Sequence, residues 1–186
     1  MKLSLEEVKR IGKEKESRIF IAGNYQDTRS LGLLEKMAFW VESFNQEIFY
    51  PVMMKNFKIP RPGEEPDWFK DFLVCSLPDL MEKECFCKLP QEERNEIAST
   101  IYLLDNCGHI FIELTTLGGG GMIPEAYVAY LKGLPMYIFK QQGHGINVAL
   151  RALFTGLNEH EYSDEGNLKQ LINTVLRSIC AERTNR

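Results

Sequence analysis

The chain has 186 residues, of which 44% are hydrophobic, enough to build a core without disulfide or metal support. Its formal net charge of −4 and the lack of a basic stripe argue against a nucleic-acid polymer as partner. The first residues are too charged for a signal peptide, and no apolar run approaches the length of a membrane span. We therefore expect a cytoplasmic protein with a single domain over residues 1–186 and a small molecule as ligand.

The five cysteines show no paired metal-ligand spacing; they stand at positions 75, 85, 87, 107 and 180. We interpret them as reduced thiols, as is usual for a cytosolic protein. Neither a metal nor a cofactor is expected.

The N-terminal half begins with the capping-box spacing of Ser4 and Glu7, which predicts a short amphipathic helix on the domain edge. Residues 17–23 form an apolar run that ends in glycine and predicts the first strand. A polar loop over 24–30 follows, and residues 47–52 predict the second strand. Between them the apolar positions have helical spacing: Leu33, Leu34, Met37, Val41 and Phe44. This order predicts a parallel sheet with helices on both faces.

Residues 53–92 interrupt this order, and we interpret them as a helical insertion because nothing in them could bury a core of its own. The aromatic residues Trp68, Phe69 and Phe72 could cap a ligand as a lid, although packing onto the body is the commoner use. Residues 90–104 predict the helix that precedes the central strand.

The central stretch predicts one βαβ unit. A strand over 109–114 is followed by four glycines at 118–121, and a helix then carries Glu125 in its first turn and ends at Gly133. The next strand begins after Pro135. Ligands of such units bind at the carboxyl ends of the strands, where glycines let backbone N–H groups come close.

The C-terminal part predicts a flexible loop with His144, a helix through Ala152 and Leu153, and a last helix capped by Ser163. His144 could contact a ligand or be an ordinary loop residue. The last helix has a core stripe at helical spacing, formed by Leu168, Leu171, Ile172, Val175, Leu176 and Ile179.

The central unit resembles the nucleoside 2-deoxyribosyltransferase superfamily, which includes the deoxynucleoside 5′-monophosphate N-glycosidases. In that family a strand ending near Glu-Val-Thr leads through a small-residue loop to Glu-x3-Ala-x3-Gly-x-Pro. This chain has Glu113-Leu-Thr115 before its loop and then the matching offsets at Glu125, Ala129, Gly133 and Pro135. The first strand ends in a similar glycine loop at Gly23, and the resemblance spans most of residues 17–180.

This resemblance implies a Rossmann-like (flavodoxin-like) fold and cleavage or transfer of the N-glycosidic bond of a nucleoside or nucleoside 5′-monophosphate. It implies that Glu125 is the nucleophile, and that a homo-oligomer completes the pocket. The implied substrate-binding residues are Gly23, Asn24, Tyr25, Asp27, Thr115, Thr116, Gly118, Gly119, Gly120 and Gly121. We expect the helix dipole to keep Glu125 ionised, as a nucleophile must be; alternatively, Glu125 only complements that dipole on an exposed face.

One position departs from the family. Its members carry an Asp on the helix before the central strand, and an ungapped alignment places Thr100 there. Glu96, Asp105 and Asp27 are nearby acids, although Asp105 is expected at the wrong end of the strand and Asp27 could be a turn residue. Glu113 could line the pocket or make a structural hydrogen bond.

Two other functions stay open. The four glycines followed by Glu125 are also similar to the loop of the phosphoribohydrolases that activate cytokinins, but Met122 stands where that family has Thr. Its second glycine motif is also missing between the first and the central strand. Since Thr100 replaces the acid, a non-catalytic nucleotide-binding or interaction protein is the other alternative.

Overall fold

The computed structural model describes residues 2–11, 14–44, 48–114, 122–145 and 158–184. Five strands form one sheet in the order β2-β1-β3-β4-β5, and every neighbouring pair is parallel. The strands are β1 (Arg18–Ala22), β2 (Tyr50–Val52), β3 (His109–Leu114), β4 (Met136–Gln141) and β5 (Asn158–Tyr162). This is the strand order of flavodoxin-like folds, so the predicted fold class is confirmed.

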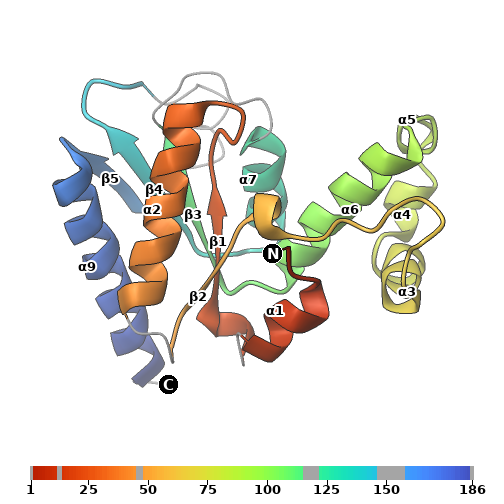
Figure 1. The fold of residues 1–186 in the computed structure, drawn as a ribbon, viewed down its shortest axis with the longest axis horizontal. Helices are drawn as coiled ribbons and strands as arrows, with labels where there is room; N and C mark the ends of the chain where they lie inside the picture. The colour runs from red at the N-terminus through yellow and green to blue at the C-terminus, as the bar shows by residue number, and fades with distance from the viewer. Residues whose placement is uncertain (1, 12–13, 45–47, 115–121, 146–157, 185–186) are drawn as a thin grey trace.

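Helices cover both faces of the sheet (Figure 1). On one face, α2 (Thr28–Phe44) and α9 (Glu165–Thr184) pack on the sheet in one hydrophobic cluster. On the other face, α1 (Leu5–Ile11), α6 (Gln91–Asp105) and α7 (Met122–Leu131) form a second cluster. Side chains of β3 alternate between the two, so that Ile110 and Ile112 face α6 and α7 while Phe111 faces α2 and α9.

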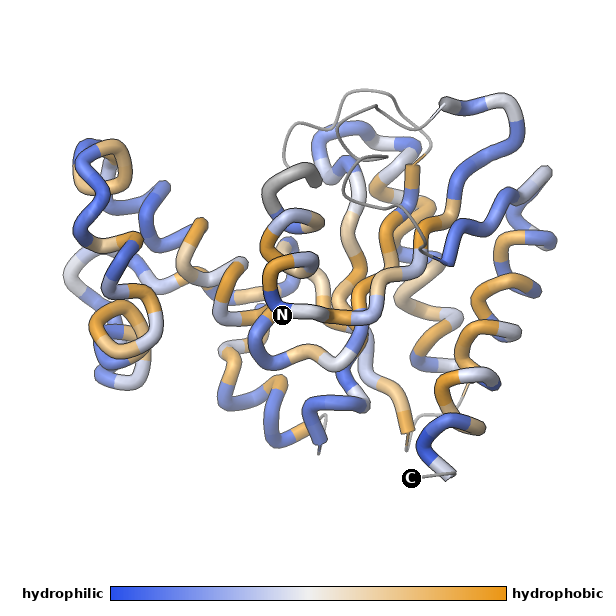
Figure 2. The backbone as a smooth tube through the Cα atoms, turned by 180° about the vertical axis from the view of Figure 1, so that it is seen from behind, coloured by the Kyte–Doolittle hydropathy of each residue, from blue (hydrophilic) through white to orange (hydrophobic). Residues whose placement is uncertain are grey.

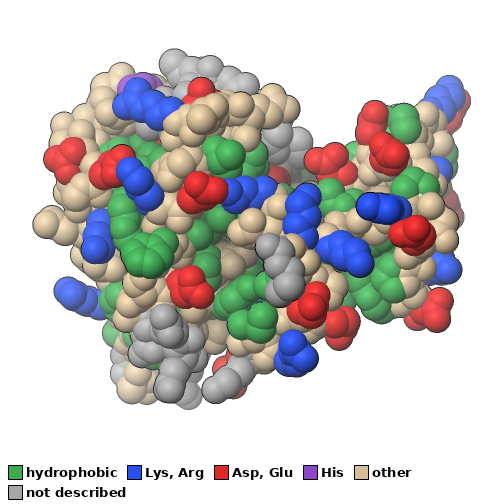
Figure 3. All heavy atoms as spheres, viewed as in Figure 1, with side chains coloured by type: hydrophobic (Ala, Val, Ile, Leu, Met, Phe, Trp, Pro, Cys, Tyr) green, Lys and Arg blue, Asp and Glu red, His purple; other side chains and the backbone are tan. Residues whose placement is uncertain are grey.

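The insertion forms a helical arm that projects from the body (Figures 1 and 2). It contains α3 (Asp67–Ser76), α4 (Pro78–Met81) and α5 (Glu84–Cys87), and the N-terminal half of α6 supports it. On the face seen in Figure 3, acidic and basic side chains surround the arm's hydrophobic ones.

Aromatic stacking fixes α3 against α6. The ring of Trp68 stacks on Tyr102 with centroids 4.7 Å apart, and the Phe72 ring meets the same tyrosine edge-on at 4.7 Å. Asn95, fully buried in α6, donates to the carbonyl oxygen of Pro60 at 2.9 Å. The aromatic residues of the insertion therefore pack onto the body, the commoner of the two predicted uses.

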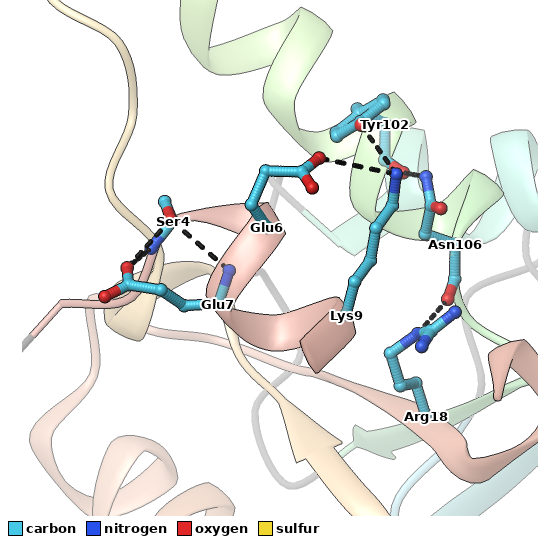
Figure 4. A network of polar contacts seen from close by, with 7 residues as sticks. All are labelled: Ser4, Glu6, Glu7, Lys9, Arg18, Tyr102 and Asn106. Carbon is cyan, nitrogen blue, oxygen red and sulfur yellow. Dashed lines mark hydrogen bonds and ion pairs between the residues drawn. The ribbon is translucent and has the colours of Figure 1, made fainter. Parts of the chain in front are cut away.

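The predicted capping box is present at the start of α1 (Figure 4). The N–H and the hydroxyl of Ser4 both donate to Oε2 of Glu7 at 2.7 Å, which satisfies the N-terminus of the helix. From the same helix, Lys9 donates to the Tyr102 hydroxyl at 3.1 Å. Two short 3-10 helices, η1 (Lys15–Ser17) and η2 (Met54–Asn56), precede β1 and follow β2.

The C-terminal region differs from its prediction in two places. Strand β5 was not predicted, because its residues are mostly polar and exposed. The cap of α9 is Asp164 and not Ser163, since Oδ1 of Asp164 accepts the N–H of Asn167 at 2.9 Å. The helix predicted through Ala152 and Leu153 lies outside the described residues.

Candidate functional site

The candidate site lies at the carboxyl edge of the sheet, where β1 and β3 are neighbours. The chain leaves β1 toward α2 on one face and leaves β3 toward α7 on the other. This divergence is the topological switch point at which open α/β sheets bind ligands. The predicted binding residues Thr115, Thr116, Gly118, Gly119, Gly120 and Gly121 belong to the connection between β3 and α7 and lie outside the described residues.

Glu125 is buried at this edge, with only 8% of its surface exposed. Its Oε2 atom has no hydrogen-bond partner among the described residues. Burial, and after it the negative charge of Glu96, raises the pKa of Glu125 from 4.5 to about 8. The expectation that the helix dipole keeps this carboxylate ionised is therefore wrong for the ligand-free protein. A dipole contributes about 0.3–1 kcal/mol at a helix end, less than the loss of hydration that burial imposes.

Tyr25 places a phenol beside this carboxyl group. Its hydroxyl donates to the carbonyl oxygen of Ile21 and accepts from the backbone N–H of Met54. Burial and then the charge of Glu125 raise the pKa of Tyr25 well above its usual value of 10. The phenol is therefore neutral at physiological pH, and its one proton is donated to Ile21.

Thr100 lies on the side of α6 that contacts η2. Its hydroxyl oxygen lies 3.6 Å from Sδ of Met54, which follows β2, and 3.1 Å from the carbonyl oxygen of Glu96. The position at which the resemblance implies an Asp therefore contacts Met54 and carries no acid. Asp105 forms an ion pair with Lys132 at the last residue of α6, which lies at the amino end of β3, as expected.

Glu113 lies on the opposite face of the sheet from Glu125. It is 1% exposed, its Oε1 accepts the Tyr162 hydroxyl at 2.6 Å, and the Ser30 hydroxyl lies 3.5 Å from its Oε2. Of the two roles considered for Glu113, these contacts favour the structural hydrogen bond. A groove of about 290 Å³ adjoins this pair, lined by Arg29, Leu33, Gln141, Tyr162, Ser163, Asp164 and Glu165.

The loop after β1 holds the other predicted binding residues in structural roles. A Cβ on Gly23 would lie 2.7 Å from Cδ2 of Leu34, so glycine lets α2 pack closely on the strand. The side-chain oxygen of Asn24 accepts the backbone N–H groups two and three residues on, at 3.1 and 3.3 Å. Asp27 caps α2 by accepting the N–H of Ser30 at 2.8 Å. Ligand binding by these residues stays a prediction.

His144 lies in a turn after β4, where its N–H donates to the carbonyl oxygen of Gln141 at 3.1 Å and Gly143 has a φ of +80°. Within the described ranges, no group of three His, Cys, Asp or Glu side chains is arranged to hold a metal ion. In that part of the chain, none of the helices is both long and apolar enough to cross a membrane.

Sequence reasoning missed Tyr162 as the partner of Glu113 and Met54 as a contact of Thr100 and Tyr25. Tyr162 ends the unpredicted strand β5, and only a prediction of that strand could have placed its hydroxyl beside Glu113. Nothing in the sequence indicated the contacts of Met54, because a methionine after a short strand is usually a core residue.

Comparison with solved structures finds chains of similar fold at low identity. The CMP N-glycosidase BcmB from Clostridium botulinum is 13% identical, with 84% of this chain and 98% of that chain covered and a TM-score of 0.45. The 2-deoxyribosyltransferase from Bacillus psychrosaccharolyticus is 12% identical, with 82% and 90% covered and a TM-score of 0.49. A conserved protein from Enterococcus faecalis V583 is 13% identical, with 86% and 98% covered and a TM-score of 0.50.

At such identities the likeness concerns the fold, which this chain shares with the Enterococcus protein. No protein-family model matches the sequence. No curated protein matches it either.

Proposed function

We propose that this protein cleaves or transfers the N-glycosidic bond of a (deoxy)nucleoside or nucleoside 5′-monophosphate, with Glu125 as nucleophile. The observation that carries the proposal is the buried carboxyl group of Glu125, whose Oε2 has no partner in the described part of the chain. A buried polar atom without a partner costs the fold about 1–3 kcal/mol, and a ligand group that donates to it would remove this cost. The offsets after Glu125 that match the deoxyribosyltransferase pattern support the same reading of the site.

The chemistry follows from what a carboxylate does at an anomeric carbon. Cleavage of a base–sugar bond develops oxocarbenium character, which an adjacent carboxylate stabilises or captures as a glycosyl ester. Water or a second base then attacks the ester and regenerates Glu125. Before the first step, Glu125 must lose the proton that its raised pKa retains at neutral pH. The neutral phenol of Tyr25, whose proton is donated to the carbonyl oxygen of Ile21, adds no negative charge near the ionised carboxylate.

The connection between β3 and α7 supplies the remaining proposed contacts. We assign sugar or phosphate binding to the backbone N–H groups of Gly118–Gly121, with Thr115 and Thr116, because glycine offers close backbone approach. Gly23, Asn24, Tyr25 and Asp27 border the same edge.

The test is incubation of the protein with a panel of nucleosides and nucleotides, followed by chromatography for released base. Wild type is expected to release base from at least one member, and Glu125→Gln is expected to lower that rate at least about a thousandfold, because it removes the attacking group. Thermal melting of the variant checks that it is folded. Full activity of a folded Glu125→Gln protein would exclude Glu125 as nucleophile.

A second function is favoured by one observation, the missing acid at Thr100. A protein that binds a nucleotide without turning it over would keep the pocket and lose the proton donor. Calorimetric binding of a nucleotide without base release would select this alternative, and release from a ribonucleoside 5′-monophosphate alone would favour the phosphoribohydrolase activity. We also propose a homo-oligomer, which light scattering at micromolar concentration tests.

A further inference from the structure

Three exposed hydrophobic residues lie together on α7. Tyr127 is 48% exposed, Tyr130 52% and Leu131 64%. Residues three and four positions apart share one face of a helix, so these side chains form one surface, here called the α7 patch. The other exposed large hydrophobic residues of the described chain are scattered, with one each on α1, α2, α3 and α6: Ile11, Phe39, Val74 and Ile97.

The composition of α7 differs from that of the other long helices. Among the described helices of ten or more residues, α2, α3, α6 and α9 all expose charged side chains, for example Lys36, Asp71, Glu93 and Lys169. The one charged residue in the sequence of α7 is Glu125, which is buried. A helix that is hydrophobic on every side is normally covered on every side. The outward face of α7 therefore has the composition of a covered surface.

The arm leaves the α7 patch open, because it projects away from α7 together with the N-terminal half of α6 (Figure 1). The two tyrosines and the leucine present roughly 300 Å² of surface, since a fully buried aromatic side chain covers about 150–250 Å². A standard interface buries about 800 Å² on each partner, around a smaller core that is rich in tyrosine and poor in charge. The α7 patch has the size and the composition of such a core.

A second copy of this chain is the partner that suits an uncharged patch. In a twofold contact each surface meets the same surface of the other copy, so a charged patch would place like charges opposite each other. The α7 patch carries no charge, and Lys132, the charged residue that follows it, is held in an ion pair by Asp105. A partner of different sequence that recognises charge would find none on this face.

We propose that α7 packs against α7 of a second copy of this chain, in a twofold dimer whose core is the α7 patch. This inference names the surface of the homo-oligomer proposed above, and it does not depend on the chemistry of Glu125. Because Glu125 stands in the first turn of the same helix, the second copy lies within two helical turns of the buried carboxyl group.

Light scattering at micromolar concentration is the first test. Wild type is expected at twice the monomer mass of 21.5 kDa. Tyr127→Glu and Leu131→Glu should each raise the dimer Kd at least about a hundredfold, because a twofold contact buries the new charge twice. Val74→Glu is the matched control, since Val74 is 69% exposed on α3, and it should leave the Kd unchanged. Tyr130→Phe keeps the ring and should stay within a few-fold of wild type, and circular dichroism checks that each variant is folded.

A second measurement needs no variant. Hydroxyl radicals label exposed side chains of wild type, and mass spectrometry compares the labelling above and below the dimer Kd. The α7 patch should lose most of its labelling at the higher concentration. Phe39 is the internal control, since it is 63% exposed on α2 and should be labelled equally at both concentrations.

Three outcomes would overturn the proposal: a monomeric wild type, a dimer that persists in both glutamate variants, or protection of Phe39 in place of the α7 patch. Base release is measured separately and distinguishes this failure from that of the proposed function. A wild-type monomer that releases base would reject the interface and leave the role of Glu125 intact. A dimer through α7 that releases no base would retain the interface and reject the proposed function.

Discussion

Two buried glutamates occupy the carboxyl edge of the sheet, and they differ in what surrounds them. Glu113 faces α2 and α9, where the hydroxyl of Tyr162 donates to it at 2.6 Å and that of Ser30 lies 3.5 Å away. Glu125 faces α6, where its Oε2 meets no donor among the described residues and Glu96 adds a second negative charge. Both are almost without solvent exposure, at 1% and 8%.

The difference separates a structural carboxylate from a reactive one. A buried charge with hydrogen-bond donors stabilises or at least does not strain the fold, whereas an unpartnered one raises the free energy of the folded state until a ligand or a proton compensates it. Burial alone would therefore not have distinguished the two glutamates. Their partners do.

The largest expected effect is on the pH dependence of stability. The pKa of Glu125 rises from 4.5 in the unfolded chain to about 8 in the folded protein, so the folded state binds this proton more tightly. The unfavourable contribution is absent below about pH 4.5, grows between pH 4.5 and 8, and is complete above pH 8. The rise corresponds to at most about 5 kcal/mol, since one pKa unit equals about 1.4 kcal/mol.

Glu125→Gln removes this ionisation and should therefore match wild type in stability near pH 5 and exceed it near pH 9. Urea unfolding of both proteins at the two pH values measures the difference. A difference between the two proteins that does not change with pH would mean that Glu125 is partnered in solution, and the contrast with Glu113 would disappear.

The next largest effect is on the stability of Glu113→Gln, which should be lowered where that of Glu125→Gln is raised. Glu113→Gln replaces the carboxyl group that accepts the Tyr162 hydroxyl by an amide and buries an N–H₂ group that needs an acceptor. We expect it to destabilise the fold by about 2–3 kcal/mol at neutral pH. Base release by the folded variant should stay within a few-fold of wild type, since Glu113 lies on the other face. Unchanged stability, or a loss of activity as large as that of Glu125→Gln, would contradict the structural role.

The sequence predicted the central strands of the sheet but not the partners that distinguish the two glutamates. Apolar runs and glycine boundaries placed β1, β3 and β4 within one or two residues, because buried parallel strands read as continuous hydrophobic segments. The prediction missed strand β5, because β5 is an edge strand that carries charged side chains. Two of them, Glu159 and Glu161, form ion pairs with Lys140 of β4. Charged side chains protect an exposed edge strand from pairing with another chain, and they also remove the apolar pattern by which a strand is predicted.

The candidate site, too, was only partly predictable from the sequence. Glu125 was identified because its spacing from the glycines and Pro135 is local in sequence. Its ionisation was predicted wrongly, because the helix end is visible in sequence while the depth of burial and the approach of Glu96 depend on how α6 packs on α7. Tyr162 is 49 residues from Glu113, so no local pattern could pair them.

The smallest expected effect is that of removing the hydrogen-bond donor, Tyr162, rather than the acceptor, Glu113. Tyr162→Phe keeps the ring that packs in the core cluster with Phe139 and Leu168 and removes only the hydroxyl. Glu113 then loses its shortest donor but keeps Ser30, so we expect a loss of about 1–2 kcal/mol in the free energy of unfolding. Urea unfolding measures it, with Tyr130→Phe as control because Tyr130 is 52% exposed and its hydroxyl can bond to water. In the double variant Tyr162→Phe/Glu113→Gln the two losses should not add, since both changes act on the same hydrogen bond. Full additivity would mean that Tyr162 and Glu113 do not depend on each other, and the structural carboxylate would then need another explanation.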